Sequence, residues 1–355
     1  MDVRGKKVTV VGMGRTAMAL LRLLLREGAH PYVTEIKPAN AVSAQVKELE
    51  ELGVQYECGG HTEAAFAGAS LIIPSPGVSP RLDQIQRAVS SGVPLMGEME
   101  FAHRHCRSRI LAVTGTNGKT TTTELLRAIM VSCGHSVQLA GNNDYPFSAA
   151  VLVEPQPEYV VLEVSSYQLE LAWLFRPWIA DLLNVTPGHL ERHGTFARYA
   201  RIKRKVFANQ RSGDVAVLNH DDPLASRIRV SRDVTQWTFS IRERVPHGLW
   251  VDGQVIRQSA YGEAQDIEVA QVADNPLLGC HNLQNVLAAL TIARAAGLDW
   301  PMVIEGLRSF RGVEHRTEFV ATLGGIDFYN DSKSTNIDSL KVALEAFSVP
   351  VVLLA

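Results

Sequence analysis

The sequence predicts a multidomain α/β protein built on parallel sheets. Residues 7–26, 110–132 and 328–347 each pass from an apolar strand-like segment through a short polar or glycine-bearing loop into a helix-like segment. Strands that alternate with helices favour a parallel sheet covered by helices on both faces. The length of 355 residues exceeds that of one ordinary core, which favours two or three domains.

The first unit, residues 1–102, is predicted to be Rossmann-like. An apolar strand at Lys7–Val11 is followed by Gly12-Met13-Gly14 and by a helical pattern over residues 16–26. Gly28 stands where a helix C-cap belongs, because glycine accepts the left-handed conformation at that position. Further strands are predicted at residues 31–36 and 71–73.

The second unit, residues 103–312, is predicted to be a central domain built on a parallel sheet. Four buried strands are expected at residues 110–113, 159–163, 179–184 and 215–219. Helices are expected at residues 121–132, 199–209 and 282–296. Residues 237–272 alternate apolar and polar side chains with glycines at turns, which predicts a small antiparallel part.

The last unit, residues 313–355, is predicted to be the start of a Rossmann-like C-terminal domain. A strand ends near residue 331, a helix covers residues 336–347, and residues 349–354 have the apolar composition of a buried strand. About forty residues cannot bury enough surface to fold alone. We therefore expect an incomplete domain or a poorly ordered last segment.

Composition excludes several classes of protein. The net charge of −2 argues against a nucleic-acid-binding protein, and no apolar run is long enough for a transmembrane helix. The N-terminus lacks the pattern of a signal peptide. The four cysteines are scattered without zinc-ligand spacing, which is typical of reduced thiols in a cytoplasmic protein.

The strongest chemical signal is the run Gly115-Thr116-Asn117-Gly118-Lys119-Thr120, between a strand and a helix. Glycines let backbone N–H groups face phosphate oxygens, and a helix N-terminus adds positive potential. Lys119 would reach the β- and γ-phosphates and the Thr120 hydroxyl would bind Mg²⁺. The usual nucleotide loop has glycine where Val113 stands, so this loop is a shortened form of that motif. The loop predicts that the second unit, residues 103–312, is a P-loop-type ATPase domain. The alternative is a surface turn with a stray lysine.

Polar side chains also follow the other central strands. Glu163 ends one strand, at the sheet edge where ligands bind and where a carboxylate can hold Mg²⁺. His189 follows the next strand and could bind a metal, although a lone histidine is more often structural. The predicted helix at residues 199–209 carries the basic side chains Arg201, Lys203, Arg204 and Lys205, which indicate either a solvated helix face or a lysine directed into a site. Asn282 lies near the start of a predicted helix. It could be the N-cap of that helix, or its side-chain amide could form hydrogen bonds with the edge of a nucleotide base.

The pattern Gly12-x-Gly14-x-x-Ala17, with Glu35 near the end of the second strand, matches the dinucleotide fingerprint. Taken alone it predicts an NAD-dependent oxidoreductase. That alternative leaves the phosphate loop unexplained, and glycines at this position also serve packing.

Taken in order, these motifs resemble the Mur ligase family from about residue 7 to the end of the chain. The resemblance is carried by Gly115-Thr116-Asn117-Gly118-Lys119-Thr120, Glu163-Val164-Ser165-Ser166-Tyr167-Gln168, Asn184-Val185-Thr186 with His189, Asn219-His220-Asp221-Asp222-Pro223, Gly279 with His281-Asn282, and Glu314-His315-Arg316. The run 330–336 and the glycine-rich start are most similar to the branch that adds D-glutamate. A folylpolyglutamate-type ligase would lack the glycine-rich N-terminal unit. A non-catalytic nucleotide-binding fragment is a further alternative. Because the last unit is incomplete, we expect a chain of this length to bind nucleotides but to ligate weakly or not at all.

The resemblance implies an ATP- and Mg²⁺-dependent amide ligase. In this family a substrate carboxylate is phosphorylated by ATP, and an incoming amine then displaces phosphate from the acyl phosphate. It implies addition of D-glutamate to UDP-N-acetylmuramoyl-L-alanine in peptidoglycan synthesis, by a cytoplasmic monomer without nucleic-acid or membrane partners.

The resemblance also assigns roles to single residues. Catalytic roles fall to Lys119, Glu163, His189 and Lys203. ATP binding falls to Gly115, Thr116, Asn117, Gly118, Lys119, Thr120, Thr121, Asn282, Arg316 and Asp331. Substrate binding falls to Thr16, Glu35, Ser75, Pro76, Gly77, Asn142, Ser165, Lys333 and Thr335. Metal ligation falls to Thr120, Glu163, His189 and, if carbamylated, Lys203.

Overall fold

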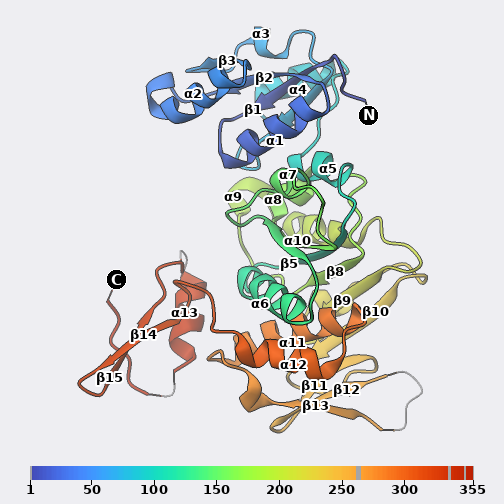
Figure 1. Cartoon of the computed structure of the whole chain (residues 1–355), viewed down its shortest axis with the longest axis vertical. Helices are drawn as coiled ribbons and strands as arrows, with labels where there is room; N and C mark the ends of the chain where they lie inside the picture. The colour runs from blue at the N-terminus through green and yellow to red at the C-terminus, as the bar shows by residue number, and fades with distance from the viewer. Residues whose placement is uncertain (1, 261–264, 335–336, 348, 355) are drawn as a thin grey trace.

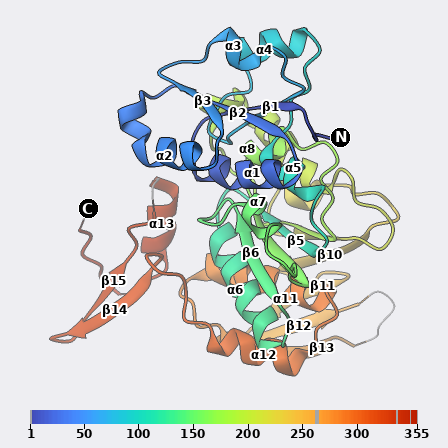
Figure 2. The same ribbon diagram turned by 45° about the horizontal axis from the view of Figure 1, so that its top comes forward.

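The computed structural model of the chain describes residues 2–260, 265–334, 337–347 and 349–354. In these residues the strands form sheets of four, nine and two strands. The four-stranded N-terminal unit lies at one end of the molecule, the nine-stranded unit follows, and the C-terminal hairpin lies to one side (Figures 1 and 2). The α/β fold class predicted from the sequence is confirmed.

The N-terminal sheet is parallel throughout, with strand order β3-β2-β1-β4. Its strands are β1 (Lys7–Val11), β2 (His30–Glu35), β3 (Gln55–Cys58) and β4 (Leu71–Pro74). Its helices are α1 (Arg15–Arg26), α2 (Ser43–Glu51), α3 (Glu63–Phe66) and α4 (Asp83–Ser90), with the 3-10 turn η1 (Ala39–Val42). A Cβ atom at Gly12, where φ is +97°, would lie 3.0 Å from the Ser75 hydroxyl oxygen. The glycine loop after β1 therefore packs directly on the loop after β4.

Short helices join this unit to the central one. Helix α5 (Glu98–His103) contacts α1 and also α7 (Phe147–Ala150) of the central unit. One cluster of buried residues runs from Val10 in β1 through Phe101 in α5 to Val164 in the central sheet. The boundary that we predict at residue 102 thus falls inside a helix that is packed from both sides.

The central sheet has the order β13-β12-β11-β10-β9-β8-β5-β7-β6. Its strands are β5 (Arg109–Thr114), β6 (Val137–Gly141), β7 (Tyr159–Val164), β8 (Ile179–Leu182), β9 (Val215–Asn219), β10 (Thr235–Ser240), β11 (Gly248–Asp252), β12 (Val255–Ser259) and β13 (Ile267–Gln271). All pairs from β6 to β11 are parallel, and only β11–β12 and β12–β13 are antiparallel. The prediction of an antiparallel part starting near residue 237 was therefore wrong for β10. The connection between β10 and β11 is a loop rather than a tight hairpin turn, so β11 re-enters the sheet in the same direction.

Helices cover both faces of the central sheet. One face carries α6 (Lys119–Ser132), α11 (Cys280–Ala295) and α12 (Trp300–Ser309), which form one buried cluster with the odd-numbered side chains of β5 and β7. The other face carries α8 (Ser166–Glu170), α9 (Leu190–His193), α10 (Phe196–Arg204) and the turn η2 (Lys205–Phe207). The turns η3 (Ala225–Arg227) and η4 (Val272–Asp274) complete the unit. The result is a three-layer unit whose parallel strands all end on one edge.

The C-terminal unit differs from our prediction. Strands β14 (Glu318–Leu323) and β15 (Ile326–Asn330) form an antiparallel hairpin across Gly324-Gly325, followed by α13 (Ile337–Glu345). The strand predicted at residues 349–354 is not formed, because no neighbouring strand lies beside it to accept its hydrogen bonds. Val352 is 88% exposed and Leu354 is 86% exposed. Described residues here form no Rossmann-like sheet.

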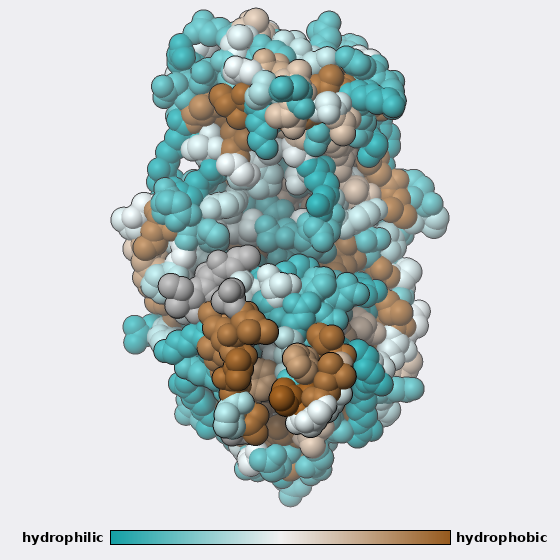
Figure 3. All heavy atoms as spheres, turned by 90° about the vertical axis from the view of Figure 1, so that its left-hand side faces the viewer, coloured by the Kyte–Doolittle hydropathy of each residue, from teal (hydrophilic) through white to brown (hydrophobic). Residues whose placement is uncertain are grey.

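The hairpin and this last segment expose an apolar patch (Figure 3). We use that name for the exposed side chains of Phe319, Val320, Leu323, Ile326, Phe328, Tyr329, Val349, Val351, Val352, Leu353 and Leu354. In the part of the chain that the structure describes, no helix is long and apolar enough to cross a membrane. Cys58, Cys106, Cys133 and Cys280 are free thiols, as predicted.

Candidate active site

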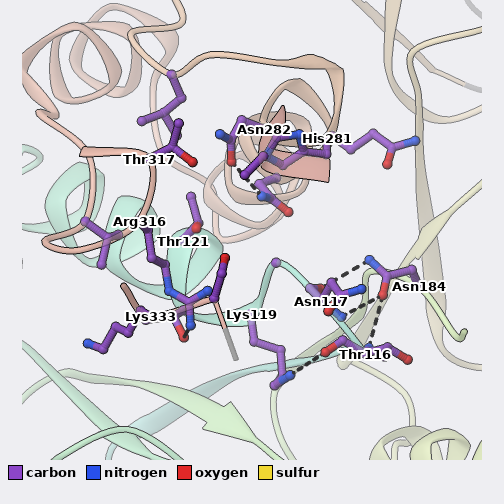
Figure 4. A pocket seen from close by; sticks show the side chains of 18 of the residues that line it. Thr116, Asn117, Lys119, Thr121, Asn184, His281, Asn282, Arg316, Thr317 and Lys333 are labelled. Carbon is purple, nitrogen blue, oxygen red and sulfur yellow. Dashed lines mark hydrogen bonds between the residues drawn. The ribbon is translucent and has the colours of Figure 1, made fainter. Parts of the chain in front are cut away.

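A cavity of about 430 Å³ lies at the carboxyl ends of the central parallel strands (Figure 4). It is closed on one side by α6 and the first turn of α11, and on another by residues of the C-terminal unit. The predicted site residues that line it are Thr116, Asn117, Gly118, Lys119, Thr120, Thr121, Asn142, Glu163, Asn282, Arg316, Asp331 and Lys333. The fold thus brings together side chains that are more than 200 positions apart in the sequence.

The phosphate-type loop between β5 and α6 has the geometry that its glycines predict. Gly118 has φ +86°, and a Cβ atom there would lie 2.2 Å from Asn285 Oδ1. Lys119 Nζ folds back over the loop and donates to the carbonyl oxygens of Gly115 at 3.0 Å and Thr116 at 2.9 Å. Burial lowers the pKa of Lys119, against the opposing charge of Glu163. The loop thus presents a helix N-terminus and a buried cation to the cavity.

Asn184, which follows β8, fixes the start of this loop. Its Oδ1 accepts hydrogen bonds from the amides of Thr116 at 3.0 Å and Asn117 at 2.9 Å, and its Nδ2 donates to the Asn117 carbonyl at 3.2 Å. These contacts are visible in Figure 4. A single side chain just after the neighbouring strand therefore holds two consecutive backbone amides of the loop.

Glu163 has the properties of a cation ligand. Its side chain is buried, and Oε1 accepts a hydrogen bond from Asn142 Nδ2 at 3.0 Å. Its Oε2 is buried and has no hydrogen-bond partner among the residues that the structure describes. An unpaired buried carboxylate oxygen fits a divalent cation. Within the described ranges no group of three or more His, Cys, Asp and Glu side chains could hold a metal, so a cation bound to Glu163 would take part of its coordination from other groups, such as hydroxyls, water or phosphate.

Lys203, on α10, lies beneath the loop rather than in the cavity lining. It is 2% exposed, and its Nζ donates to the Gly115 carbonyl at 2.6 Å and lies 5.0 Å from the centre of the Tyr199 ring. Burial, and next the positive charge of Lys119, lower the pKa of Lys203 well below its ordinary value. An amine with a lowered pKa is neutral, and therefore nucleophilic, in a larger fraction of molecules.

His189 and Ser165 are placed differently from the cavity residues. His189 has φ +52° at the start of α9, and its Nδ1 lies 3.1 Å from the Tyr167 hydroxyl and 3.7 Å from Glu191 Oε1. Ser165 caps α8, where its Oγ accepts from the Gln168 amide at 3.3 Å. Neither side chain lines the cavity.

The far wall of the cavity comes from α11 and the C-terminal unit. Asn282 Nδ2 donates to the Leu278 carbonyl at 2.7 Å, and Asn282 Oδ1 accepts from Asn285 Nδ2 at 3.0 Å. Arg316 Nη2 donates to Thr120 Oγ1 at 3.3 Å, whereas its Nε is buried without a partner among the described residues. The guanidinium therefore reaches the first turn of α6 from another unit and keeps one donor unused.

The predicted substrate residues of the N-terminal unit form a separate group. Both carboxylate oxygens of Glu35 accept backbone amides, Oε2 from Met13 at 2.7 Å and Oε1 from Lys37 at 3.0 Å. Thr16 lies in the first turn of α1, and Ser75, Pro76 and Gly77 follow β4 beside Gly12. None of these lines the cavity. Thr335 lies outside the described residues.

One ionic contact connects the two groups. Arg15, at the start of α1, donates from Nη1 to the carbonyl oxygen of Asp144 at 3.1 Å and also contacts its carboxylate. Asp144 follows Asn142, which lines the cavity, by two residues. Arg15 holds the pKa of Asp144 below its usual value. The glycine loop of the N-terminal unit therefore lies beside the mouth of the central site.

The cavity is also lined by residues to which the sequence analysis gave no role in a site, although Asn184, Thr186 and His281 belong to the motifs that carry the resemblance. These residues are Asn184, Thr186, Leu277, His281, Gln284, Asn285, Val313, Thr317, Ser334 and Ala343. Asn184 and Asn285 carried a signal, since both are polar residues at the end of a strand or on an apolar helix. The apolar residues carried none, because nothing local distinguishes them from core positions.

Comparison with known proteins defines the class. Residues 113–293 match the family described as the Mur ligase middle domain, and residues 6–97 match the Mur ligase MurD-like N-terminal domain. The chain belongs to the Mur ligase family, as its motifs predicted.

Two curated relatives and one solved structure show which members of the family the chain is similar to. The chain is 42% identical to the UDP-N-acetylmuramoylalanine--D-glutamate ligase of Acidobacterium capsulatum, over 98% of this chain and 75% of that protein. It is 40% identical to the enzyme of the same name from Pelotomaculum thermopropionicum, over 100% of this chain and 77% of that protein. A solved structure of UDP-N-acetylmuramate-alanine ligase from Thermotoga maritima has a TM-score of 0.57 at 22% identity, over 96% of this chain and 77% of that one, and shows the shared fold.

Proposed function

We propose that the chain is an ATP-dependent ligase that adds D-glutamate to UDP-N-acetylmuramoyl-L-alanine in peptidoglycan synthesis. The observation that carries this proposal is the convergence of Lys119, Glu163 and Arg316 on one cavity. Two anions, a carboxylate and a triphosphate, must meet there, and cations around a phosphate loop neutralise their charge. The similarity to D-glutamate ligases over 98–100% of the chain supports the choice of substrate.

In this proposal the loop residues 115–121 hold the triphosphate of ATP. Lys119 releases the Gly115 and Thr116 carbonyls and contacts phosphate oxygens, while Arg316 approaches from the opposite wall. Bound Mg²⁺ would neutralise triphosphate charge, held by Thr120 and the free Oε2 of Glu163. His189 and a carbamylated Lys203 are proposed as further metal ligands. Asn282 and Asp331 would hold the nucleoside end.

The remaining assignments follow the position of each group. The UDP part would lie on the glycine loop of the N-terminal unit, against Thr16, Glu35 and residues 75–77. Asn142 and Ser165 would face the muramoyl end, and Lys333 and Thr335 the incoming amino acid. The substrate carboxylate attacks the γ-phosphate and releases ADP, and the amine of D-glutamate then attacks the acyl carbon and releases phosphate. The four free thiols support a location in the reducing cytoplasm.

Ligand-dependent thermal unfolding tests the proposal. A ligand at about 100 times its dissociation constant stabilises the state that binds it by about 2.7 kcal/mol. We expect UDP-N-acetylmuramoyl-L-alanine and Mg-ATP each to raise the melting temperature, and NAD to leave it unchanged. Stabilisation by NAD alone would show that the glycine loop belongs to an oxidoreductase.

Substrate choice is tested by mass-spectrometric detection of product with single amino acids. We expect ligation of D-glutamate in preference to L-alanine, L-lysine and diaminopimelate. Preference for any of the other three would reject the D-glutamate assignment while keeping the ligase class.

A further inference from the structure

A second layer of buried polar side chains lies behind the phosphate loop. Asn219, the last residue of β9, is 2% exposed, and Asp222, in the turn that follows, is 7% exposed. Neither lines the cavity, so neither would touch a nucleotide bound there. Buried polar groups that contact no ligand need a structural or positioning role.

These two side chains hold the loop after β8 from behind. Asn219 Nδ2 donates to the Leu183 carbonyl at 2.8 Å, and Asp222 Oδ2 accepts from the Val185 amide at 3.1 Å. The two contacts fall on the residues immediately before and after Asn184. The backbone on both sides of Asn184 is therefore fixed by hydrogen bonds, one of them to a carboxylate.

The two holding side chains are themselves fixed. Asn219 Oδ1 accepts from the Asp221 amide at 2.9 Å. Asp222 Oδ1 accepts from the amides of Leu224 at 3.0 Å and Ala225 at 2.7 Å. Each carboxylate or carboxamide oxygen therefore has a defined partner, which leaves one orientation for each side chain.

We propose that Asn219 and Asp222 are positioning residues for the nucleotide. They hold the backbone around Asn184, whose side chain holds the Thr116 and Asn117 amides, and so set the phosphate loop from two layers away. Because the beginning of the phosphate loop is fixed in this way, the free amides at the N-terminus of α6 keep their direction toward the cavity. The inference rests on the proposed function, because it takes ATP as the ligand of the loop.

Two isosteric substitutions break one contact each. In Asp222→Asn the remaining oxygen keeps the Leu224 and Ala225 amides, which turns the new NH₂ group toward the Val185 N–H. In Asn219→Asp a carboxylate oxygen faces the Leu183 carbonyl. We expect each variant to weaken Mg-ATP binding about tenfold, the effect of losing one hydrogen bond to a charged or buried group. Binding of UDP-N-acetylmuramoyl-L-alanine should change less than about twofold.

The matched control is Asp214→Asn. Asp214 is also a buried aspartate, 2% exposed, at the opposite end of β9, where it pairs with Arg176 at 2.6 Å. This control should lower the melting temperature without changing the dissociation constant of Mg-ATP. Loss of affinity in the control equal to that in Asp222→Asn would show that general destabilisation, rather than positioning, weakens binding.

A double-mutant cycle tests the route through Asn184. In an Asn184→Ala background, Asp222→Asn should weaken Mg-ATP binding by less than a further factor of about two. The reason is that the Asn184 side chain, through which Asp222 acts on the loop, is already absent. Full additivity would overturn the proposal. Hydrogen exchange of the peptide covering residues 113–118 gives a readout without nucleotide, and we expect faster exchange in Asp222→Asn than in Asp214→Asn.

The outcomes separate the two levels of inference. If the unmodified chain binds no Mg-ATP, the proposed function fails, and the exchange rates still decide whether Asp222 holds the loop. If the chain binds Mg-ATP, but Asp222→Asn changes neither affinity nor exchange, only the positioning role fails.

Discussion

At the residue scale, Asp181 is a carboxyl group placed where water cannot reach it. It lies in β8 between Val113 of β5 and Val217 of β9, is fully buried, and has no hydrogen-bond partner for either oxygen among the described residues. Burial raises the pKa of Asp181 well above its ordinary value. The folded protein therefore holds a proton there that the unfolded chain releases at lower pH.

This burial predicts a pH-dependent stability. Above about pH 3.9 the unfolded chain loses the proton while the folded protein keeps it, so the free energy of unfolding falls as pH rises, until the folded group also ionises. Asp181→Asn removes this dependence, and we expect it to unfold with about 1–3 kcal/mol more free energy at pH 8 and with an equal value near pH 4. Denaturant unfolding at both pH values measures this. The exposed Asp233→Asn is the control, and a difference from wild type that does not change with pH would contradict the prediction.

Lys119 gives a residue-scale prediction about activity, with little change expected in stability. Its ammonium is desolvated beside Glu163, so replacement by the apolar methionine should leave the melting temperature within about 2 °C. The same change removes the cation that would stabilise phosphoryl transfer, and ligation should fall about 10²–10³-fold. Product formation measured by mass spectrometry checks this, with the exposed Lys47→Met as control. Ligation by Lys119→Met close to that of wild type would remove Lys119 from the site.

At the element scale, the unit formed by β5, its loop and α6 depends on one backbone conformation. Gly118 precedes α6 in the left-handed region, with Asn285 of α11 packed against it. The loop is held from one side by α11 and from the other by Asn184. Its shape is thus set by two neighbouring elements as well as by its own glycines.

Gly118→Ala tests this arrangement. A left-handed alanine costs about 1–2 kcal/mol, and its Cβ would lie 2.2 Å from Asn285 Oδ1, so the loop must shift. We expect the free energy of unfolding to fall by about 2 kcal/mol and Mg-ATP affinity to fall by more than tenfold. Calorimetry and titration measure the two effects. Gly60→Ala, where a Cβ meets nothing within 4 Å and φ is not positive, should change neither. Unchanged affinity in Gly118→Ala would mean that nucleotide does not use this loop.

At the scale of the whole molecule, the three units differ in how much of their apolar surface is buried. The N-terminal and central sheets share buried residues through α5, whereas the C-terminal hairpin exposes the apolar patch (Figure 3). Contiguous apolar surface of this kind favours association. Arg316 nevertheless ties this unit to the first turn of α6.

The patch predicts binding of an apolar dye and self-association as the protein concentration rises. The double variant Val352→Gln with Leu354→Gln should reduce dye fluorescence and association, because these side chains are 88% and 86% exposed. Its melting temperature should not change, since no buried contact is lost. Sedimentation over a range of concentrations measures association. Ile36→Gln, 63% exposed in the N-terminal unit, is the control, and an equal effect of this change would show that the patch is not responsible.

Local signals determined much of the protein. Apolar strands followed by glycine loops predicted β1, β5 and the phosphate loop, because strand period, glycine conformation and helix start all depend on neighbouring residues. Our prediction missed β14, although Gly324-Gly325 between two apolar runs is a local signal of the hairpin, and it wrongly placed a strand at residues 349–354. A strand forms only where a neighbouring strand accepts its backbone hydrogen bonds, and apolar composition does not show whether such a neighbour is present.

The sequence by itself therefore determined the fold class, the position of the phosphate loop and membership of the Mur ligase family. Only the tertiary structure decided which distant residues meet. It brought Arg316 to Thr120, placed Asn184 on the Thr116 and Asn117 amides, and put Lys203 beneath the loop rather than in the cavity lining. It also buried Asp181 without a hydrogen-bond partner in the described part of the chain. The physical reason is that a local pattern fixes backbone conformation, whereas contacts between side chains depend on how strands pair and helices pack across the whole chain.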